Sequence, residues 1–213
     1  MAPQISAQEK ENRASIRKTI KNIKQNITVC KRLIPQRPNT YIAKIAGLLY
    51  DLGYLYWMHL DDMASAEKMF LQALEYFEKY RGQKKEMVSL KIKTMEYLVR
   101  IYNRTDRLEL SEQMLLRILE QQRQLAQKCW WIYLENVAIT QWQLGNLYVD
   151  MERFQEAEQM YLTALETRTE FEDEDPVRYR PATAQCQRSL GRLYEFYLHD
   201  PVRAATYYRL AEQ

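Results

Sequence analysis

The chain has 213 residues, of which 46% are hydrophobic and 28% charged, and its net charge is +3. This balance excludes a disordered chain. Five glycines and six prolines are too few for the many turns of an all-β fold. No apolar run is long enough to span a membrane, and the N-terminus lacks the apolar core of a signal peptide. A cytoplasmic helical protein is expected.

The first predicted element is a helix from Ser6 to Leu33, with Ser6 and Glu9 as a capping box. Its isoleucines recur at helical spacing on one face. Pro35 and Pro38 end it. Residues 1–32 hold eight basic and two acidic residues, whereas the remaining chain holds 23 basic and 26 acidic ones. The sequence therefore predicts an N-terminal segment, residues 1–39, made of a basic amphipathic helix and a proline-containing linker.

The basic face of this helix has three interpretations. It is a solvated polar surface, a contact for an acidic protein, or an adaptor for nucleic acid or an anionic membrane. The third interpretation predicts binding that weakens steeply with salt, because phosphate contacts are electrostatic. Nucleic acid and membrane are the less favoured partners.

A five-residue motif recurs along the rest of the chain. Leu144-Gly145-Asn146-Leu147-Tyr148 returns as residues 190–194 and matches residues 52–56. A fourth copy, residues 98–102, has valine in place of glycine. The second positions, 53, 99, 145 and 191, are each 46 residues apart. A fixed period of this size indicates an array of repeated units.

A second motif follows each copy of the first. It places a small, a large and a small residue at i, i+4 and i+7, as in Ala157, Tyr161 and Ala164. These positions form one stripe on a helix. The second motif follows 12 residues after positions 99 and 145 but 13 after positions 53 and 191, which predicts one extra residue in the first and fourth turns. Each unit is therefore a helical hairpin that buries its apolar face only against its neighbours.

The Leu-Gly-x-x-Tyr and Ala-x-x-x-Phe-x-x-Ala patterns resemble those of the tetratricopeptide repeat family. The period of 46 exceeds the usual 34, so longer helices are expected, as in kinesin light chain-like proteins and some bacterial regulators. The resemblance implies an all-α fold, a right-handed α-solenoid of four such hairpins behind the N-terminal helix. The predicted repeat domain spans residues 40–213, with units at about 40–81, 84–127, 129–171 and 177–213.

The acidic run at 172–175 is interpreted as part of a solvated linker from Phe171 to Pro181. The last helix is expected to be short. The array therefore either continues in a longer protein or is covered at this end, with self-association as one possibility.

The resemblance also implies a binding surface. In this family the first-helix face at offsets −6, −3, +1 and +4 from the small residue lines a concave groove. Aromatic and arginine side chains, the usual anchors of interfaces, are frequent at these offsets. The peptide-binding residues predicted in this way are Tyr50, Tyr54, Trp57, Lys93, Arg100, Asn103, Trp142, Asn146, Arg188 and Arg192. The expected partner is a peptide or helix of another protein with apolar anchors and some acidic character.

Two alternatives to this interpretation are open. In the first, the aromatic residues of the first unit pack against the N-terminal helix instead of a partner: Tyr50, Tyr54 and Trp57. A secretion or assembly chaperone that captures a client segment is the alternative function for the same groove. Recognition of the carboxylate tail of heat-shock chaperones is not expected, because Tyr50 and Tyr54 replace the lysine and asparagine that bind it.

Catalytic and cofactor chemistry is not predicted. His59 and His199 lie near turns, with no cysteine or aspartate at the spacing of a triad or metal site. The three cysteines, Cys30, Cys129 and Cys186, form no CxxC pair and are expected to be reduced thiols. No phosphate-binding glycine loop occurs. The sequence predicts a scaffold or adaptor without enzymatic activity, metal or cofactor.

Overall fold

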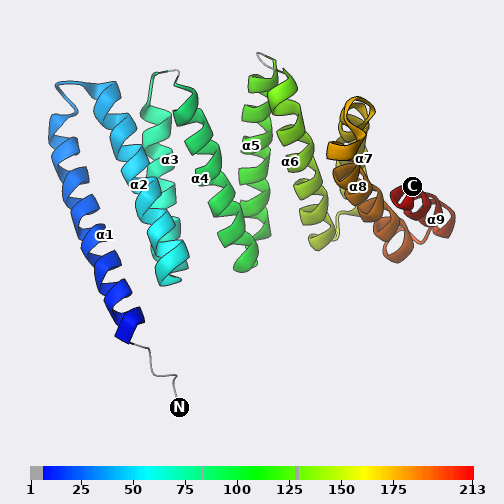
Figure 1. Ribbon diagram of the computed structural model, residues 1–213, viewed down its shortest axis with the longest axis horizontal. Helices are drawn as coiled ribbons and strands as arrows, with labels where there is room; N and C mark the ends of the chain where they lie inside the picture. The colour runs from blue at the N-terminus through cyan, green and yellow to red at the C-terminus, as the bar shows by residue number, and fades with distance from the viewer. Residues whose placement is uncertain (1–6, 83, 128–129) are drawn as a thin grey trace. The chain divides into compact units, whose positions relative to one another are not determined.

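The computed structural model describes residues 7–82, 84–127 and 130–213, with side chains from residue 11 onward except those of 130–132. These residues form helices and no strands. The helices are α1 (Ala7–Leu33), α2 (Pro38–Leu60), α3 (Met63–Lys79), α4 (Lys85–Arg104), α5 (Leu108–Ala126), α6 (Trp130–Asp150), α7 (Phe154–Glu174), α8 (Pro176–Phe196) and α9 (Pro201–Glu212). The predicted capping residue Ser6 lies outside the described residues. The all-α prediction is confirmed (Figure 1).

The chain divides into two compact units, Met1–Ile101 and Tyr102–Gln213. Unit 1 contains α1, α2, α3 and most of α4, and unit 2 contains the end of α4 and helices α5 to α9. The domain boundary predicted at residue 39 stays a prediction.

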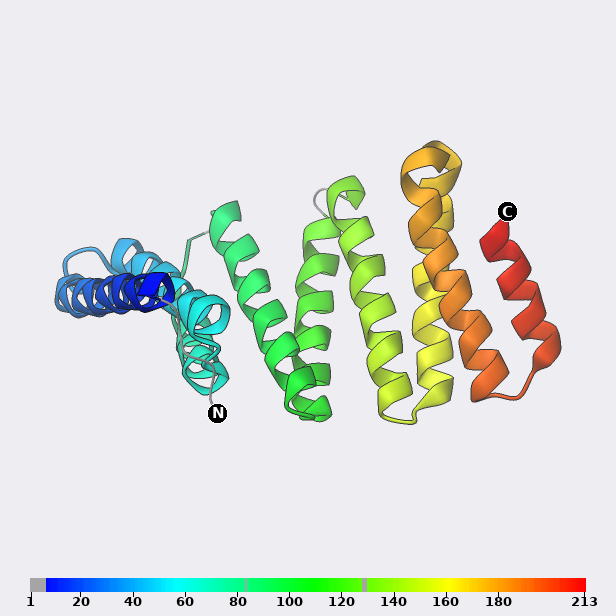
Figure 2. The same ribbon diagram turned by 60° about the horizontal axis from the view of Figure 1, so that its bottom comes forward.

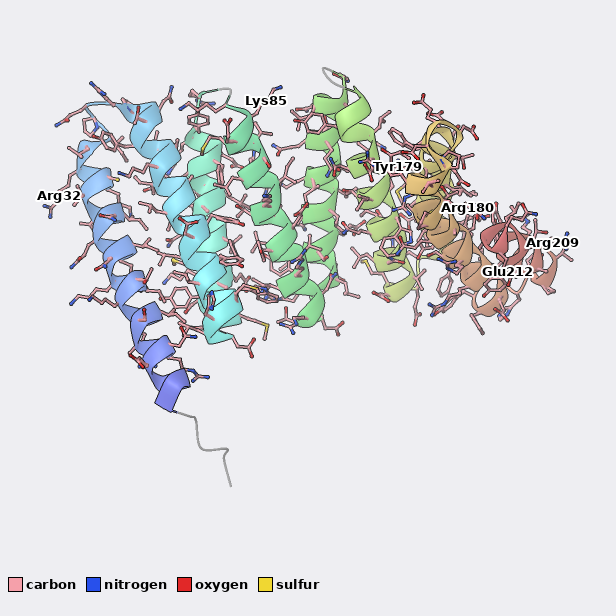
Figure 3. All side chains as sticks on the ribbon, in the orientation of Figure 1. Arg32, Lys85, Tyr179, Arg180, Arg209 and Glu212 are labelled. Atoms are coloured by element: carbon pink, nitrogen blue, oxygen red, sulfur yellow. The ribbon has the colours of Figure 1, made fainter. Side chains whose placement is uncertain are left out.

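In unit 1, α2 packs against both α1 and α3. Ile20, Ile27 and Cys30 of α1 are buried, whereas its basic side chains from Arg13 onward are exposed. Arg32, for example, projects away from α2 (Figure 3). Helix α1 therefore packs its apolar face against the hairpin and exposes its basic side chains to solvent.

In unit 2, α6 packs on α5 and α7, and α8 packs on α7 and α9. Figure 2 shows α7 beside both α6 and α8. The motif glycines explain this close packing. A Cβ on Gly145 would lie 2.5 Å from the ring of Tyr161, and one on Gly191 would lie 2.7 Å from the ring of Tyr208. The ring of each second helix therefore occupies the space that a side chain on the first helix would need.

The motif tyrosines join successive hairpins of unit 2. Tyr194 of α8 donates a hydrogen bond to Glu158 of α7, and Arg203 of α9 lies 3.4 Å from the same carboxylate and over the tyrosine ring. At the preceding junction, Tyr148 and Arg153 contact Glu112 of α5 in the same way. Burial, followed by the hydrogen bond to the glutamate, raises the pKa of each tyrosine to about 12. Both phenols are therefore neutral donors at physiological pH.

Each turn within a hairpin contains one non-glycine residue with positive φ: Asp61, Asp106, Glu152 and His199. This residue always precedes the small residue of the second motif by five positions. It follows the small residue of the first motif by seven positions in the second and third hairpins but by eight in the first and fourth. The predicted extra residue therefore lies before the left-handed position, at the end of the first helix.

The linker predicted from Phe171 to Pro181 is wrong. Helix α7 continues to Glu174, α8 begins at Pro176, and Pro181 lies inside α8. Phe171 is buried and its ring contacts that of Tyr179 at 5.2 Å, which holds the two helix ends together. The Asp175 side chain caps α8 by accepting from the backbone N–H of Arg178 at 3.2 Å.

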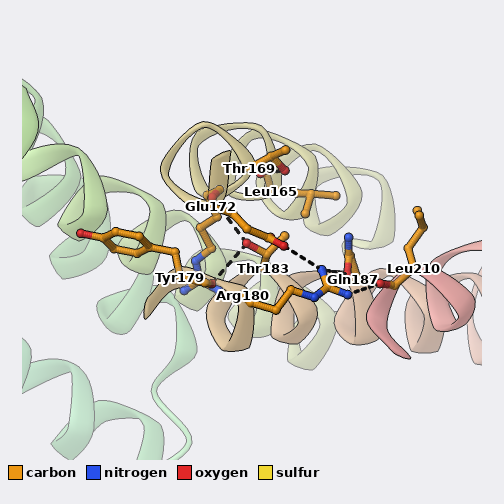
Figure 4. Close-up of polar contacts among 9 residues, drawn as sticks. Leu165, Thr169, Glu172, Tyr179, Arg180, Thr183, Gln187 and Leu210 are labelled. Atoms are coloured by element: carbon orange, nitrogen blue, oxygen red, sulfur yellow. Dashed lines mark hydrogen bonds and ion pairs between the residues drawn. The ribbon is translucent and has the colours of Figure 1, made fainter. Parts of the chain in front are cut away.

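The C-terminal end of helix α9 is bound by a side chain of α8. Arg180 of α8 donates to the Leu210 carbonyl at the end of α9, and it also contacts Glu172 of α7 at 3.3 Å and Gln187 at 3.4 Å (Figure 4). A cation at a helix C-terminus is favourable, because the unpaired carbonyls there carry partial negative charge. Arg180 therefore connects three helices of unit 2.

Candidate functional site

In unit 1 the predicted residues form part of an aromatic cluster. The rings of Tyr50 and Tyr54 on α2 lie 6.1 and 5.9 Å from the ring of Tyr97 on α4. Phe70 of α3 stacks on Tyr97 at 5.2 Å. Arg100, one turn along α4, places its guanidinium 5.3 Å from the same ring. The cluster joins α2, α3 and α4, and it presents an exposed cation beside half-buried phenols.

The electrostatics of this cluster favour neutral phenols. Burial, followed by the neighbouring Tyr97, raises the pKa of Tyr50 to about 12. Trp57 is half-buried on α2, and Lys93 is exposed on α4. The structure thus brings Tyr50, Tyr54 and Arg100 together.

The alternative packing against the N-terminal helix involves a different tyrosine. Tyr56 accepts a hydrogen bond from Lys24 of α1 at 3.0 Å, and the lysine ammonium lies 5.6 Å from its ring centre. The recorded ring contacts of Tyr50 and Tyr54 are instead with α3, α4 and His59. Helix α1 therefore packs on the Tyr56 side of α2 and leaves the Tyr97 side to α4.

In unit 2 the predicted face of α6 lines two pockets between the same three helices, and we call the two together the α6–α8 groove. The first, of about 180 Å³ and called here the Asn146 pocket, has walls from α6, α7 and α8. The second, of about 240 Å³ and called here the Arg168 pocket, has walls from the same three helices. All four α6 residues at the groove offsets line one pocket or the other: Ile139, Trp142, Asn146 and Val149.

Hydrogen bonds fix the polar groups of the Asn146 pocket. Tyr161 of α7 donates its hydroxyl to Asn146 Oδ1 at 2.7 Å, which orients the amide so that its N–H groups remain as donors. Trp142 donates its indole N–H to Ser189 Oγ of α8 at 2.9 Å. Arg192 of α8 is exposed and lines the Asn146 pocket. Asp150 of α6 also lines this pocket, which therefore offers amide donors, one cation and one carboxylate.

The Arg168 pocket is more apolar. Half of its lining residues are large and apolar or aromatic: Ile139, Trp142, Phe171 and Tyr179. Arg168 of α7 also lines it, although this residue is only 5% exposed. The guanidinium lies 6.0 Å from the Trp142 ring. This pocket can hold an apolar side chain and place a charge next to it.

The predicted site residues of unit 2 do not all meet. Trp142, Asn146 and Arg192 line the groove, whereas Arg188 and Asn103 are exposed and line neither pocket. Offsets on the first helices could not reveal Tyr161 or Arg168, because both belong to a second helix. The sequence held one signal for Arg168. The equivalent position of the preceding repeat, 46 residues earlier, is a neutral glutamine, Gln122, so the arginine departs from its repeat partner.

The remaining candidate chemistry is sparse. His59 and His199 are exposed at the ends of hairpins, and Cys30 and Cys186 are buried free thiols. Cys129 lies outside the described residues. Within the part of the chain that the structure describes, no cluster of His, Cys, Asp or Glu could hold a metal ion. Among the described helices, none is both long and apolar enough to cross a membrane.

Repeated hairpins that line grooves with aromatic and cationic side chains define a helical-repeat scaffold. Two family models, both described as tetratricopeptide repeat, match residues 46–80 and 136–213, which together make up just over half of the chain. The chain belongs to the tetratricopeptide repeat family, as the motifs predicted. Members of this family bind proteins and are generally not enzymes. No curated protein matches the chain in sequence.

Solved structures share the fold at low identity. BtubC (BKLC) from P. vanneervenii is 22% identical with a TM-score of 0.59, and the match covers 92% of this chain and 72% of that one. RapI in its apo form is 14% identical with a TM-score of 0.61, over 90% of this chain but only 48% of that one. A putative kinesin light chain with TPR-like repeats from Podosopora anserina is 13% identical with a TM-score of 0.58, over 98% and 96%. The predicted α-solenoid fold class is confirmed.

Proposed function

We propose that this protein is a scaffold that binds a segment of another protein along the faces of its first helices. The observation that carries the proposal is the α6–α8 groove, because all four α6 residues at the family's groove offsets line its two pockets. Trp142, Asn146 and Arg192 are its expected anchors. The cluster of Tyr50, Tyr54 and Arg100 supplies a second contact surface in unit 1.

The groove favours a segment with apolar and acidic side chains. Its walls combine aromatic rings with Arg168 and Arg192, and Asn146 adds amide donors. Two carboxylates, Asp150 and Glu135, also line it. Donors and cations recognise carboxylates, and rings provide apolar contact area. Binding an extended client in the same groove would make the protein a chaperone, and a client captured only in its unfolded state would distinguish that function.

The test compares two binding-surface variants with a matched control. N146A/R192A removes an amide and an arginine from the α6–α8 groove. Y54A/R100A removes a tyrosine and an arginine from the aromatic cluster of unit 1. Q143A/R209A removes an exposed amide and an exposed arginine that line neither pocket. Partners are captured from a lysate with each variant at low and moderate salt, after circular dichroism has shown equal helicity.

The proposal is supported if both binding-surface variants lose the same partner while the control variant retains that partner at moderate salt. Equal capture by all variants contradicts it.

A second candidate function rests on α1. Arg17, Lys21 and Lys24 line an open hollow of about 450 Å³ on its surface, and all three side chains are exposed. Such a basic surface attracts RNA, DNA or anionic lipid. Binding of single-stranded RNA or of phosphatidylserine vesicles that K21E/K24E abolishes and high salt weakens would support it. Wild-type binding that is insensitive to salt would argue against it.

A further inference from the structure

Arg168 is a buried cation that the repeat architecture does not require. Its Nη1 donates to the Ala182 carbonyl at 2.6 Å and to Cys186 Sγ at 3.1 Å, both on α8. One repeat earlier, 46 residues back at both positions, Gln122 accepts a hydrogen bond from Thr140 at 2.8 Å. A neutral amide and a hydroxyl therefore join two hairpins at one junction, where an arginine and a thiol do so at the next.

The charge of Arg168 has no counterion among the described residues. None of the ion pairs between described side chains involves Arg168. Its neighbour Cys186 does not neutralise it, because burial raises the pKa of that thiol above its usual range although the guanidinium opposes the shift. Burying an unpaired charge is costly, and such groups are normally paired.

The donors that remain on Arg168 are available to a ligand. A guanidinium has five N–H groups, and the recorded bonds use only those on Nη1. Arg168 lines the pocket, so a ligand there approaches this side chain. The Nε and Nη2 edge matches the two oxygens of a carboxylate.

The rest of the pocket limits what can bind there. Ile139, Trp142, Phe171 and Tyr179 surround the guanidinium with apolar surface. The one carboxylate in the wall, Glu135, lies 3.9 Å from the exposed Arg178, which partly balances it. A low-dielectric wall strengthens an ion pair formed inside it.

We infer that the Arg168 pocket binds the carboxylate of an aspartate or glutamate within the segment that occupies the α6–α8 groove. The inference rests on the proposed function, whose anchors lie in the adjoining Asn146 pocket. Both pockets lie along α6, at Asn146 and at Trp142, so a chain that occupies both would place an internal side chain at Arg168. Apolar residues next to the acidic one fill the ring-lined wall.

The test uses a library of short peptides with blocked termini and a central glutamate between aromatic or leucine residues. Each peptide has a twin with glutamine in place of glutamate. The affinity of each pair is measured by fluorescence anisotropy for the wild-type chain, R168Q and R192Q. R168Q installs the residue that the preceding junction uses at this position, and R192Q removes one exposed positive charge from the same groove.

The wild type is expected to bind glutamate peptides about tenfold more tightly than their twins, because a charged hydrogen-bonded pair is worth that much. R168Q is expected to reduce this ratio to about one, whereas R192Q weakens both twins and preserves it. If R168Q does not fold, R168Q/C186T reproduces the Gln122–Thr140 pair and replaces it.

Equal wild-type binding of the twins overturns the inference, as does a ratio that survives R168Q. Peptides that bind without discrimination leave the groove function in place. Absence of any binding up to about 1 mM, combined with unaltered partner capture by N146A/R192A, removes the groove function as well.

Discussion

The substitution Gly145→Ala tests how closely the hairpins pack. Gly145 is buried in α6, and an added Cβ would lie 2.5 Å from Cδ1 and Cε1 of Tyr161 and 3.1 Å from Cγ. The ring cannot move easily, because Tyr161 is 3% exposed and its hydroxyl is bonded to Asn146 at 2.7 Å. Either the helices separate or the ring shifts and breaks that bond.

The expected cost follows from three contributions. Overpacking a core costs about 1 to 3 kcal/mol. Loss of the Tyr161–Asn146 bond adds about 1 kcal/mol. Replacing glycine by alanine inside a helix returns about 1 kcal/mol. The free energy of unfolding should therefore fall by about 1 to 3 kcal/mol, and peptide binding in the groove should weaken because Asn146 loses its orientation.

Urea denaturation followed by circular dichroism measures the change, with Gly47→Ala as the control. Gly47 is also a helix-interior glycine, but its nearest neighbour, Leu90, would lie 3.9 Å from an added Cβ, which is an ordinary contact. G47A should leave stability unchanged or raise it slightly. A G145A chain as stable as the wild type, or equal losses in both variants, would refute the packing argument.

Two further predictions concern tyrosine and arginine contacts. Because burial and the bond to Glu158 raise the pKa of Tyr194 from its ordinary value of 10.0 to about 12, the neutral form of Tyr194 stabilises the fold. This contribution is complete below pH 10 and is lost as the pH rises from 10 to 12. Tyr194→Phe should therefore lower the free energy of unfolding near neutral pH by about 1 kcal/mol. In urea titrations at rising pH, the variant should lose less stability between pH 10 and 12 than the wild type. An equal loss in both chains would contradict this role of Tyr194. Arg180→Ala should accelerate amide hydrogen exchange in α9, whereas Arg209→Ala, an exposed arginine on α9 itself, should not. Equal exchange in both variants would show that Arg180 does not anchor the helix.

The repeat pattern made most of the fold predictable. A period of 46 placed the glycine of one helix opposite the ring of the next, and these contacts are present at Gly53, Gly145 and Gly191. The helix ends were less predictable, because they depend on contacts between distant side chains. The acidic run at 172–175 predicted a loop, but burial of Phe171 against Tyr179 accompanies a helix that continues to Glu174.

The site was predictable in part. Offsets on α6 led to Trp142 and Asn146, since a helix repeats its faces regularly. Arg188 follows the same offset rule but lines neither pocket. Arg168 could not be identified from one helix face, because its role depends on which atoms of α8 lie opposite it. The hydroxyl of Tyr161 is likewise positioned only by the packing of α7 on α6.

The equivalence of Gln122 and Arg168 has a consequence for how such a protein can evolve. Arg168 both bonds to α8 and lines the pocket, whereas the glycine and ring contacts that set the helix spacing occupy other positions of the repeat. A new side chain at the second kind of position changes ligand chemistry at one junction, while the glycine and ring contacts remain intact. Recognition can thus diversify junction by junction, while the glycine and ring contacts between the paired helices are retained.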